Sequence, residues 1–194
     1  SIYYSAWESL GKHKRDLLKE RVEDARDGQA AAAKQFKDAL TRLKELTRFD
    51  GGDLEKAYNA LKADQDRFTA RADALRERIR AMEQVAKDLF AEWTGEIESI
   101  SSPRLREDSR AKLKRTQERF DELSMAMKRA EQGMEPVLTQ FRDYVLYLKH
   151  NLNAQAIGSL RGESLNIEKE MLQLIAEMNS AISKADAFVK ELPE

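Results

Sequence analysis

The sequence contains no cysteine, which excludes thiol catalysis, disulfide bonds and cysteine-ligated metals. Its 194 residues include two histidines, three prolines and eight glycines, and aromatic residues make up 7%. No apolar run approaches the ~20 residues that a membrane-spanning helix requires. The chain therefore has few of the residues on which disulfide scaffolds and histidine metal centres are built.

Charged and hydrophobic residues dominate what remains. They make up 36% and 41% of the chain, a combination typical of long helices and coiled coils. The 34 basic and 35 acidic residues nearly cancel, so the net charge is −1. We therefore expect no overall attraction to nucleic acid and predict no nucleic-acid partner.

Apolar residues recur every three or four positions along four segments, which places them on one helix face in each segment. These seams run from Leu18 to Leu46, from Leu75 to Ile100, from Leu113 to Leu152 and from Ile167 to Leu192. Segments of similar length joined by short turns favour antiparallel neighbours. We predict an all-α fold, an elongated antiparallel up-down-up-down helical bundle with coiled-coil-like heptad packing.

Breaks between the seams give the expected bounds. Asp53 follows two glycines and is a natural N-cap, and Ser102 precedes Pro103 in the same role. Pro136 is expected to bend the third helix locally. We expect one domain, residues 1–194, with helices at approximately 2–48, 53–101, 103–150 and 154–192.

The net charge alternates from helix to helix. Residues 1–48 carry +3, residues 49–102 carry −4, residues 103–152 carry +3 and residues 153–194 carry −3. In a ring of four helices every neighbour then has the opposite sign. Because exposed ion pairs contribute only ~0–1 kcal/mol each, this pattern favours register and specificity more than stability.

Catalytic and metal-binding patterns are missing from the sequence. Neither His13 nor His150 follows a glutamate by three residues, as the di-iron bundles require, and no nucleophile elbow or phosphate loop occurs. Carboxylate pairs such as Asp64 with Asp66 are expected to face solvent. We predict no enzyme activity, no cofactor and no metal site.

The N-terminal segment combines aromatic and basic residues. Aromatic rings at a membrane interface with cations near the headgroups would suit it. The alternative is an ordinary helix start whose charges pair with neighbours such as Asp16 and Glu20. The candidate membrane-proximal residues are Tyr3, Tyr4, Trp7, Lys12, Lys14 and Arg15.

Residues 145–163, VLYLKHNLNAQAIGSLRGE, break the helical pattern with polar residues and two glycines. They form either a recognition patch at one end of the rod or a joint in which the asparagines bond their own backbone. Tyr144, Tyr147 and Phe90 lie beyond the seams and mark either a dimer surface or a wider core stripe. The candidate partner-binding residues are His150, Asn151, Asn153, Gln155, Arg161 and Glu163.

The segments YYSAWESLGKHKRDLLKERVEDARD, FDGGDLE, MEPVL and LKHNLNAQAIGSLRGE together resemble an uncharacterised bacterial family, a domain of unknown function of about this length. The resemblance implies secreted proteins or lipoproteins, and hence a periplasmic or envelope-associated location. The resemblance further implies a signal or lipid anchor, which would precede Ser1. The family implies no reaction and no catalytic residue.

The expected function is a non-enzymatic structural or protein-interaction module of the bacterial envelope, tethered at its N-terminus, with an unidentified protein partner. The alternative is a membrane-surface protein that recognises lipid or curvature. Self-association stays open.

Overall fold

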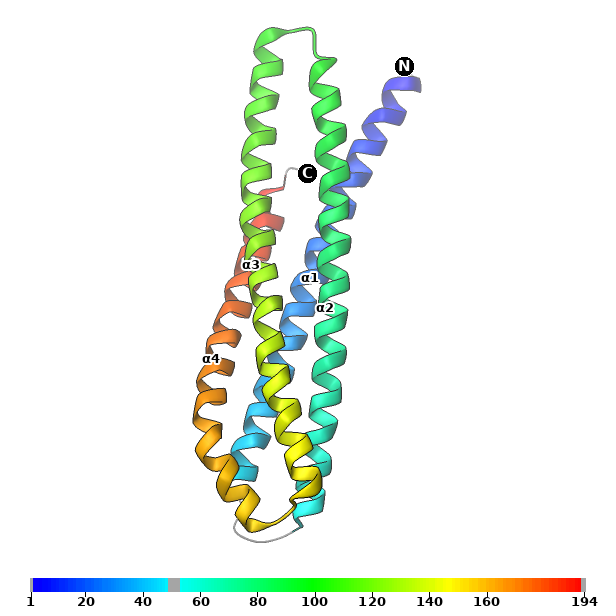
Figure 1. Ribbon diagram of the computed structural model, residues 1–194. Helices are drawn as coiled ribbons and strands as arrows, with labels where there is room; N and C mark the ends of the chain where they lie inside the picture. The colour runs from blue at the N-terminus through cyan, green and yellow to red at the C-terminus, as the bar shows by residue number, and fades with distance from the viewer. Residues whose placement is uncertain (1, 49–52, 193–194) are drawn as a thin grey trace.

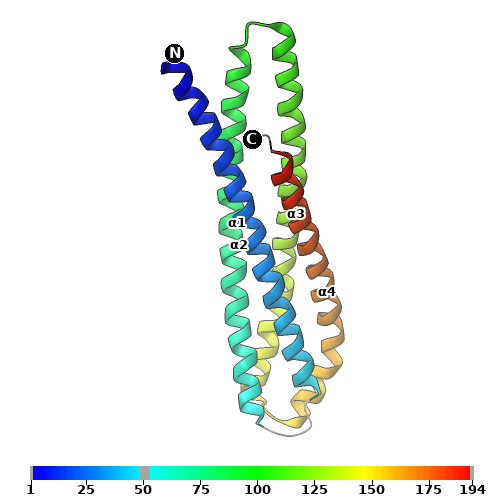
Figure 2. The ribbon, with the colours of Figure 1, turned by 180° about the vertical axis from the view of Figure 1, so that it is seen from behind.

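The computed structural model describes residues 2–48 and 53–192, and the backbone alone for residues 2–12. Four long helices run alternately up and down and form a rod (Figures 1 and 2). Each packs against two neighbours, α1 against α2 and α4, and α3 against α2 and α4. The predicted all-α antiparallel bundle is therefore confirmed. The helices are α1 (Ile2–Thr47), α2 (Leu54–Glu98), α3 (Pro103–His150) and α4 (Ala154–Glu191).

Caps define the helix starts that the sequence indicated. The Asp53 carboxylate accepts a hydrogen bond from the Lys56 N–H at 3.0 Å, and the Ser102 hydroxyl accepts one from the Leu105 N–H at 3.4 Å. Helix α2 ends at Glu98, before the expected residue 101. Pro103 disfavours helical backbone in the residue before it, and Ser102 is accordingly extended, at φ −73° and ψ 118°.

The seam residues are buried along most of the rod. Towards the end of the rod that holds the α3–α4 connection, the Phe68 ring packs on Phe36 and Phe141, with ring centroids 3.7 and 5.5 Å apart. The seam is less buried at Trp93, Ile100 and Thr116. They belong to the α2–α3 hairpin, which extends beyond the end of α4 (Figure 1), so the core lacks its α4 wall there.

Two glycines allow helices to approach closely. A Cβ built on Gly28 of α1 would lie 3.2 Å from the Leu75 side chain of α2, and one on Gly133 of α3 would lie 3.1 Å from Leu174 of α4. Both distances are shorter than the ~3.5–4.0 Å that is optimal for two non-bonded carbon atoms. Glycine at these positions therefore belongs to the packing of the bundle.

Ion pairs between helices follow the alternation of charge. Cations come from α1 or α3 and acids from α2 or α4, except that Arg76 of α2 pairs with Glu131 and Glu135 of α3, at 2.6 and 3.8 Å. The alternation of helix charge is therefore reflected in which side chains pair between neighbouring helices. The pairs that obey it are Lys14–Glu92, Arg42–Asp64, Lys128–Glu83, Arg110–Glu98, Arg119–Glu191, Lys44–Glu168 and Arg26–Asp186.

Among the described residues, the most deeply buried polar side chains are those of Gln29 and Asp64. Gln29 of α1 is fully buried, and its amide donates a hydrogen bond to the Met127 carbonyl of α3 at 3.2 Å. Asp64 of α2 is 1% exposed and receives Arg42 at 2.7 Å and Arg67 at 3.0 Å. Polar core residues of this kind fix the register of neighbouring helices.

The prediction that Asp64 faces solvent is wrong. Leu61, Asp64 and Phe68 are spaced by three and four residues, so the α2 seam continues through Asp64. Burial raises the pKa of the Asp64 carboxyl above its usual range, Asp38 adds to this effect, and Arg42 and Arg67 oppose it. The carboxylate is therefore held in the core at a cost.

The raised pKa of Asp64 predicts how the free energy of unfolding depends on pH. Because the folded pKa is raised, folded protein binds more protons than unfolded protein between about pH 4 and the raised pKa. The contribution of Asp64 to stability falls as pH rises through this window. In Asp64→Asn, which cannot ionise, the free energy of unfolding relative to wild type should increase from pH 4 to pH 7, measured by urea denaturation.

Asp66→Asn is the matched control, because Asp66 is exposed. If the free energy of unfolding of Asp64→Asn instead falls relative to wild type as pH rises, the arginines outweigh burial and the prediction is contradicted.

Candidate partner-binding site

The connection between α3 and α4 uses both of its asparagines locally. Asn151 donates its side-chain amide to the Tyr147 carbonyl at 3.0 Å and thereby caps α3. Asn153 is the N-cap of α4, with its side-chain oxygen accepting from the Ala156 N–H at 2.9 Å. The Asn153 N–H also donates to the Asn151 carbonyl at 3.0 Å. These two predicted site residues are brought together as a joint.

Arg161 and Glu163 tie α4 to its neighbours. The Arg161 Nε–H donates to the Thr47 carbonyl at 2.7 Å, at the C-terminal end of α1. The Tyr144 hydroxyl donates to the Glu163 backbone carbonyl at 3.2 Å, and burial raises the Tyr144 pKa. The Glu163 carboxylate itself lies on the surface.

The remaining candidates are exposed. His150 and Gln155 face solvent, and neither side chain makes a hydrogen bond among the described residues. Tyr144 is buried and Phe90 packs against the core, which supports the wider core stripe for both, whereas Tyr147 is 40% exposed.

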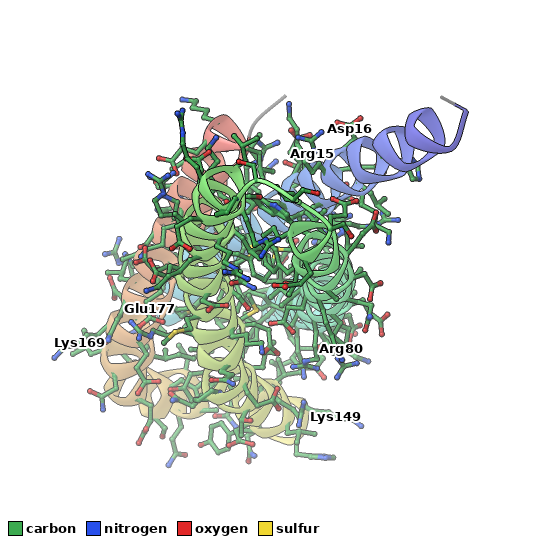
Figure 3. All side chains as sticks on the ribbon, turned by 90° about the horizontal axis from the view of Figure 1, so that it is seen from above. Arg15, Asp16, Arg80, Lys149, Lys169 and Glu177 are labelled. Atoms are coloured by element: carbon green, nitrogen blue, oxygen red, sulfur yellow. The ribbon has the colours of Figure 1, made fainter. Side chains whose placement is uncertain are left out.

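Sequence reasoning noted the two glycines of this segment but missed the row that they begin on the outside of α4. Gly158 and Gly162 face outward, and a Cβ on either would meet no atom within 4 Å. Leu165 and Leu172 continue the same spacing and are 71% and 52% exposed. Lys169 lies between them and projects away from the bundle (Figure 3). We call these five residues the outer face of α4. A search for a second heptad row beside the core row would have found them.

A pocket of about 490 Å³ opens between α1 and α4 beside this face. We call it the α1–α4 pocket. Lys44 of α1 pairs with Glu168 of α4 across it at 2.7 Å. Its lining is Leu40, Leu43, Lys44, Thr47, Arg48, Arg161, Ser164, Leu165 and Glu168. Arg161 is the one member among the predicted site residues, because residues far apart in sequence build the rest.

The candidate membrane-proximal residues lie near the opposite end of the rod. The side chains of Tyr3, Tyr4, Trp7 and Lys12 lie outside the described residues. Lys14 pairs with Glu92 of α2, and Arg15 lies near Glu96. The pKa of Glu96 is raised, chiefly by burial and then by Glu92, while Arg15 and Lys14 lower it.

The part of the chain that the structure describes holds no group of three or more histidine, aspartate or glutamate side chains placed to bind a metal ion. Within the same residues, no helix combines the length and apolarity needed to cross a bilayer.

The joint can be tested by removing a cap. Asn153→Ala should lower the free energy of unfolding by about 1 kcal/mol, because it leaves a backbone donor of α4 without its partner. Gln155→Ala, two residues on and exposed, should change it by less than about 0.5 kcal/mol. Equal effects in chemical denaturation would argue against the capping role.

The comparisons with known proteins give a family. No curated protein matches the chain. A family model described as "Protein of unknown function (DUF2959)" matches residues 3–192. This match covers nearly the whole bundle and agrees with the resemblance seen in the sequence. The chain belongs to the DUF2959 family.

Proposed function

We propose that this chain is a non-enzymatic protein-interaction module of the bacterial cell envelope, and that its partner docks on the outer face of α4. The observation that carries the proposal is the pair of outward glycines, Gly158 and Gly162, beside two exposed leucines. Gln155 and Glu163 of α4 border this face as exposed polar groups.

The glycines lower helix stability without an internal benefit. Glycine inside a helix costs roughly 1 kcal/mol relative to alanine. Gly28 and Gly133 compensate by admitting a neighbouring helix, but space around Gly158 and Gly162 is open. A partner whose backbone approaches α4 closely would occupy that space.

The arrangement of the ends supports a tethered module. The start of α1 and the α3–α4 connection lie towards opposite ends of the rod (Figure 1). Helix α1 has 46 residues, or roughly 70 Å of length. An N-terminal anchor in the envelope, as the resemblance implies, would hold the outer face of α4 well away from the membrane, where another protein can reach it.

The use of the polar side chains supports a non-catalytic role. Asn151, Asn153 and Arg161 cap helix ends, and Gln29 and Asp64 join helices. These groups are engaged in holding the bundle together, and none needs a substrate for its place to be explained.

A membrane-surface protein is the second candidate. The first turns of α1 diverge from α2 (Figures 1 and 2), which separates the N-terminal segment from the bundle. An aromatic and basic segment held apart in this way would be free to lie on lipid headgroups.

Site-specific photo-crosslinking in the native host tests the proposal. A photo-crosslinking residue at exposed Ser159, between the two glycines, should capture one defined protein. A photo-crosslinking residue placed at exposed Ala70 of α2 is the control and should not capture this protein. The capture should also fall when Leu165→Ser is added, whereas Leu146→Ser, at a 52% exposed leucine of α3, should leave it unchanged.

Equal capture from Ser159 and Ala70, or none from either, would contradict a docking surface on α4. Capture of phospholipid by a photo-crosslinking residue at Tyr4 together with no protein at Ser159 would favour the membrane-surface alternative.

A further inference from the structure

The α1–α4 pocket has an apolar floor and a cationic rim. Leu40 and Leu43 of α1 are buried beneath it, and Leu165 forms an exposed wall. Its volume of about 490 Å³ lies within the range of pockets that bind ligands. A bulky apolar side chain of a partner would pack against these leucines and leave water. Side chains of this kind are the usual anchors of protein–protein interfaces.

The rim is positively charged. The lining has Lys44, Arg48 and Arg161 against one acid, Glu168, and so carries a net charge of +2. This contrasts with residues 153–194, which carry −3 as a whole. The Arg161 Nε–H is used on the Thr47 carbonyl, but a guanidinium has five donor hydrogens, so four remain outside that bond.

The cations continue along α1 beside the outer face of α4. Lys37 precedes Lys44 by seven residues and therefore lies on the same face of α1, and Arg48 follows one turn later. Leu172 lies two turns beyond Leu165 on α4. A row of leucines on α4 thus runs beside a row of cations on α1, along the axis of the rod.

This pattern fits a helix better than a lipid. The leucines and glycines recur at helical spacing along several turns of α4, and a partner helix lying along α4 would contact the whole row. A lipid headgroup would cover about one turn. Acidic residues beside the apolar stripe of that helix would face Lys37, Lys44 and Arg48.

We propose that the occupant of the α1–α4 pocket and the outer face of α4 is an acidic amphipathic helix of a partner protein, anchored by a bulky apolar side chain in the pocket. This inference rests on the proposed function and names the chemistry of the partner at that site.

The test reverses charge on the rim and reads the capture from Ser159. Lys37→Glu with Arg48→Glu changes two exposed residues, so the bundle should stay folded, as circular dichroism would verify. Capture of the partner should fall about tenfold, because like charges now oppose the acidic helix. Arg71→Glu with Arg80→Glu, exposed arginines of α2, makes the same charge change elsewhere and should leave the capture unchanged.

Mass spectrometry of the captured peptide gives the second readout. A segment with acidic residues and apolar residues at helical spacing supports the proposal. A basic segment, a second copy of this chain, or capture that survives the charge reversal but falls in Leu165→Ser would overturn it and leave the docking surface standing. Absence of any capture from Ser159 would overturn the proposed function as well.

Discussion

Burial of four apolar stripes against one another is the constraint on which the rest of this structure depends. A helix that carries one stripe cannot hide it alone, and each large side chain that leaves water contributes about 1.5–3 kcal/mol. Phe36, Phe68 and Phe141 come from three different helices and meet in the core. The alternation of charge matches this arrangement, since cations of α1 and α3 meet acids of α2 and α4 on every side of the ring.

Departures from this apolar interior have identifiable roles. Gln29 and Asp64 each occupy a seam position that a leucine would fill with less desolvation. Both join helices, Gln29 through the Met127 carbonyl and Asp64 through Arg42. If a helix slid by one turn, both side chains would be buried without these partners. A buried polar group without a partner costs more free energy than its hydrogen bond contributes. They therefore make one register of the bundle preferable to its neighbours.

Most of the fold was predictable from the sequence, because it depends on local signals. The four seams, the caps at Asp53 and Ser102 and the sign of each helix all follow from residues close together in the chain. The joint at Asn151 and Asn153 was one of two readings, and its geometry emerged only in three dimensions. Asp64 was misjudged because the α2 seam was begun too late, at Leu75. The α1–α4 pocket depends on how α1 and α4 meet, and no local pattern contains that information.

The outer face of α4 is where the chain departs from what its own stability requires. Its glycines admit no neighbour, its leucines stay in water, and the cations of α1 lie beside them. Under the proposed function, a docked partner would give this combination a use that the bundle itself does not supply. We propose that these residues serve a partner and that the rest of the rod holds them in place.

The most direct measurement is the free energy of unfolding of Gly158→Ala/Gly162→Ala, made together with partner capture from Ser159. The account predicts that stability rises by roughly 1–2 kcal/mol, because both positions are helical and open, and that capture falls because the added methyl groups keep the partner away. A loss of stability would show that the fold itself needs the glycines. A gain in stability with unchanged capture would show that no partner approaches this face, and either result would contradict the account.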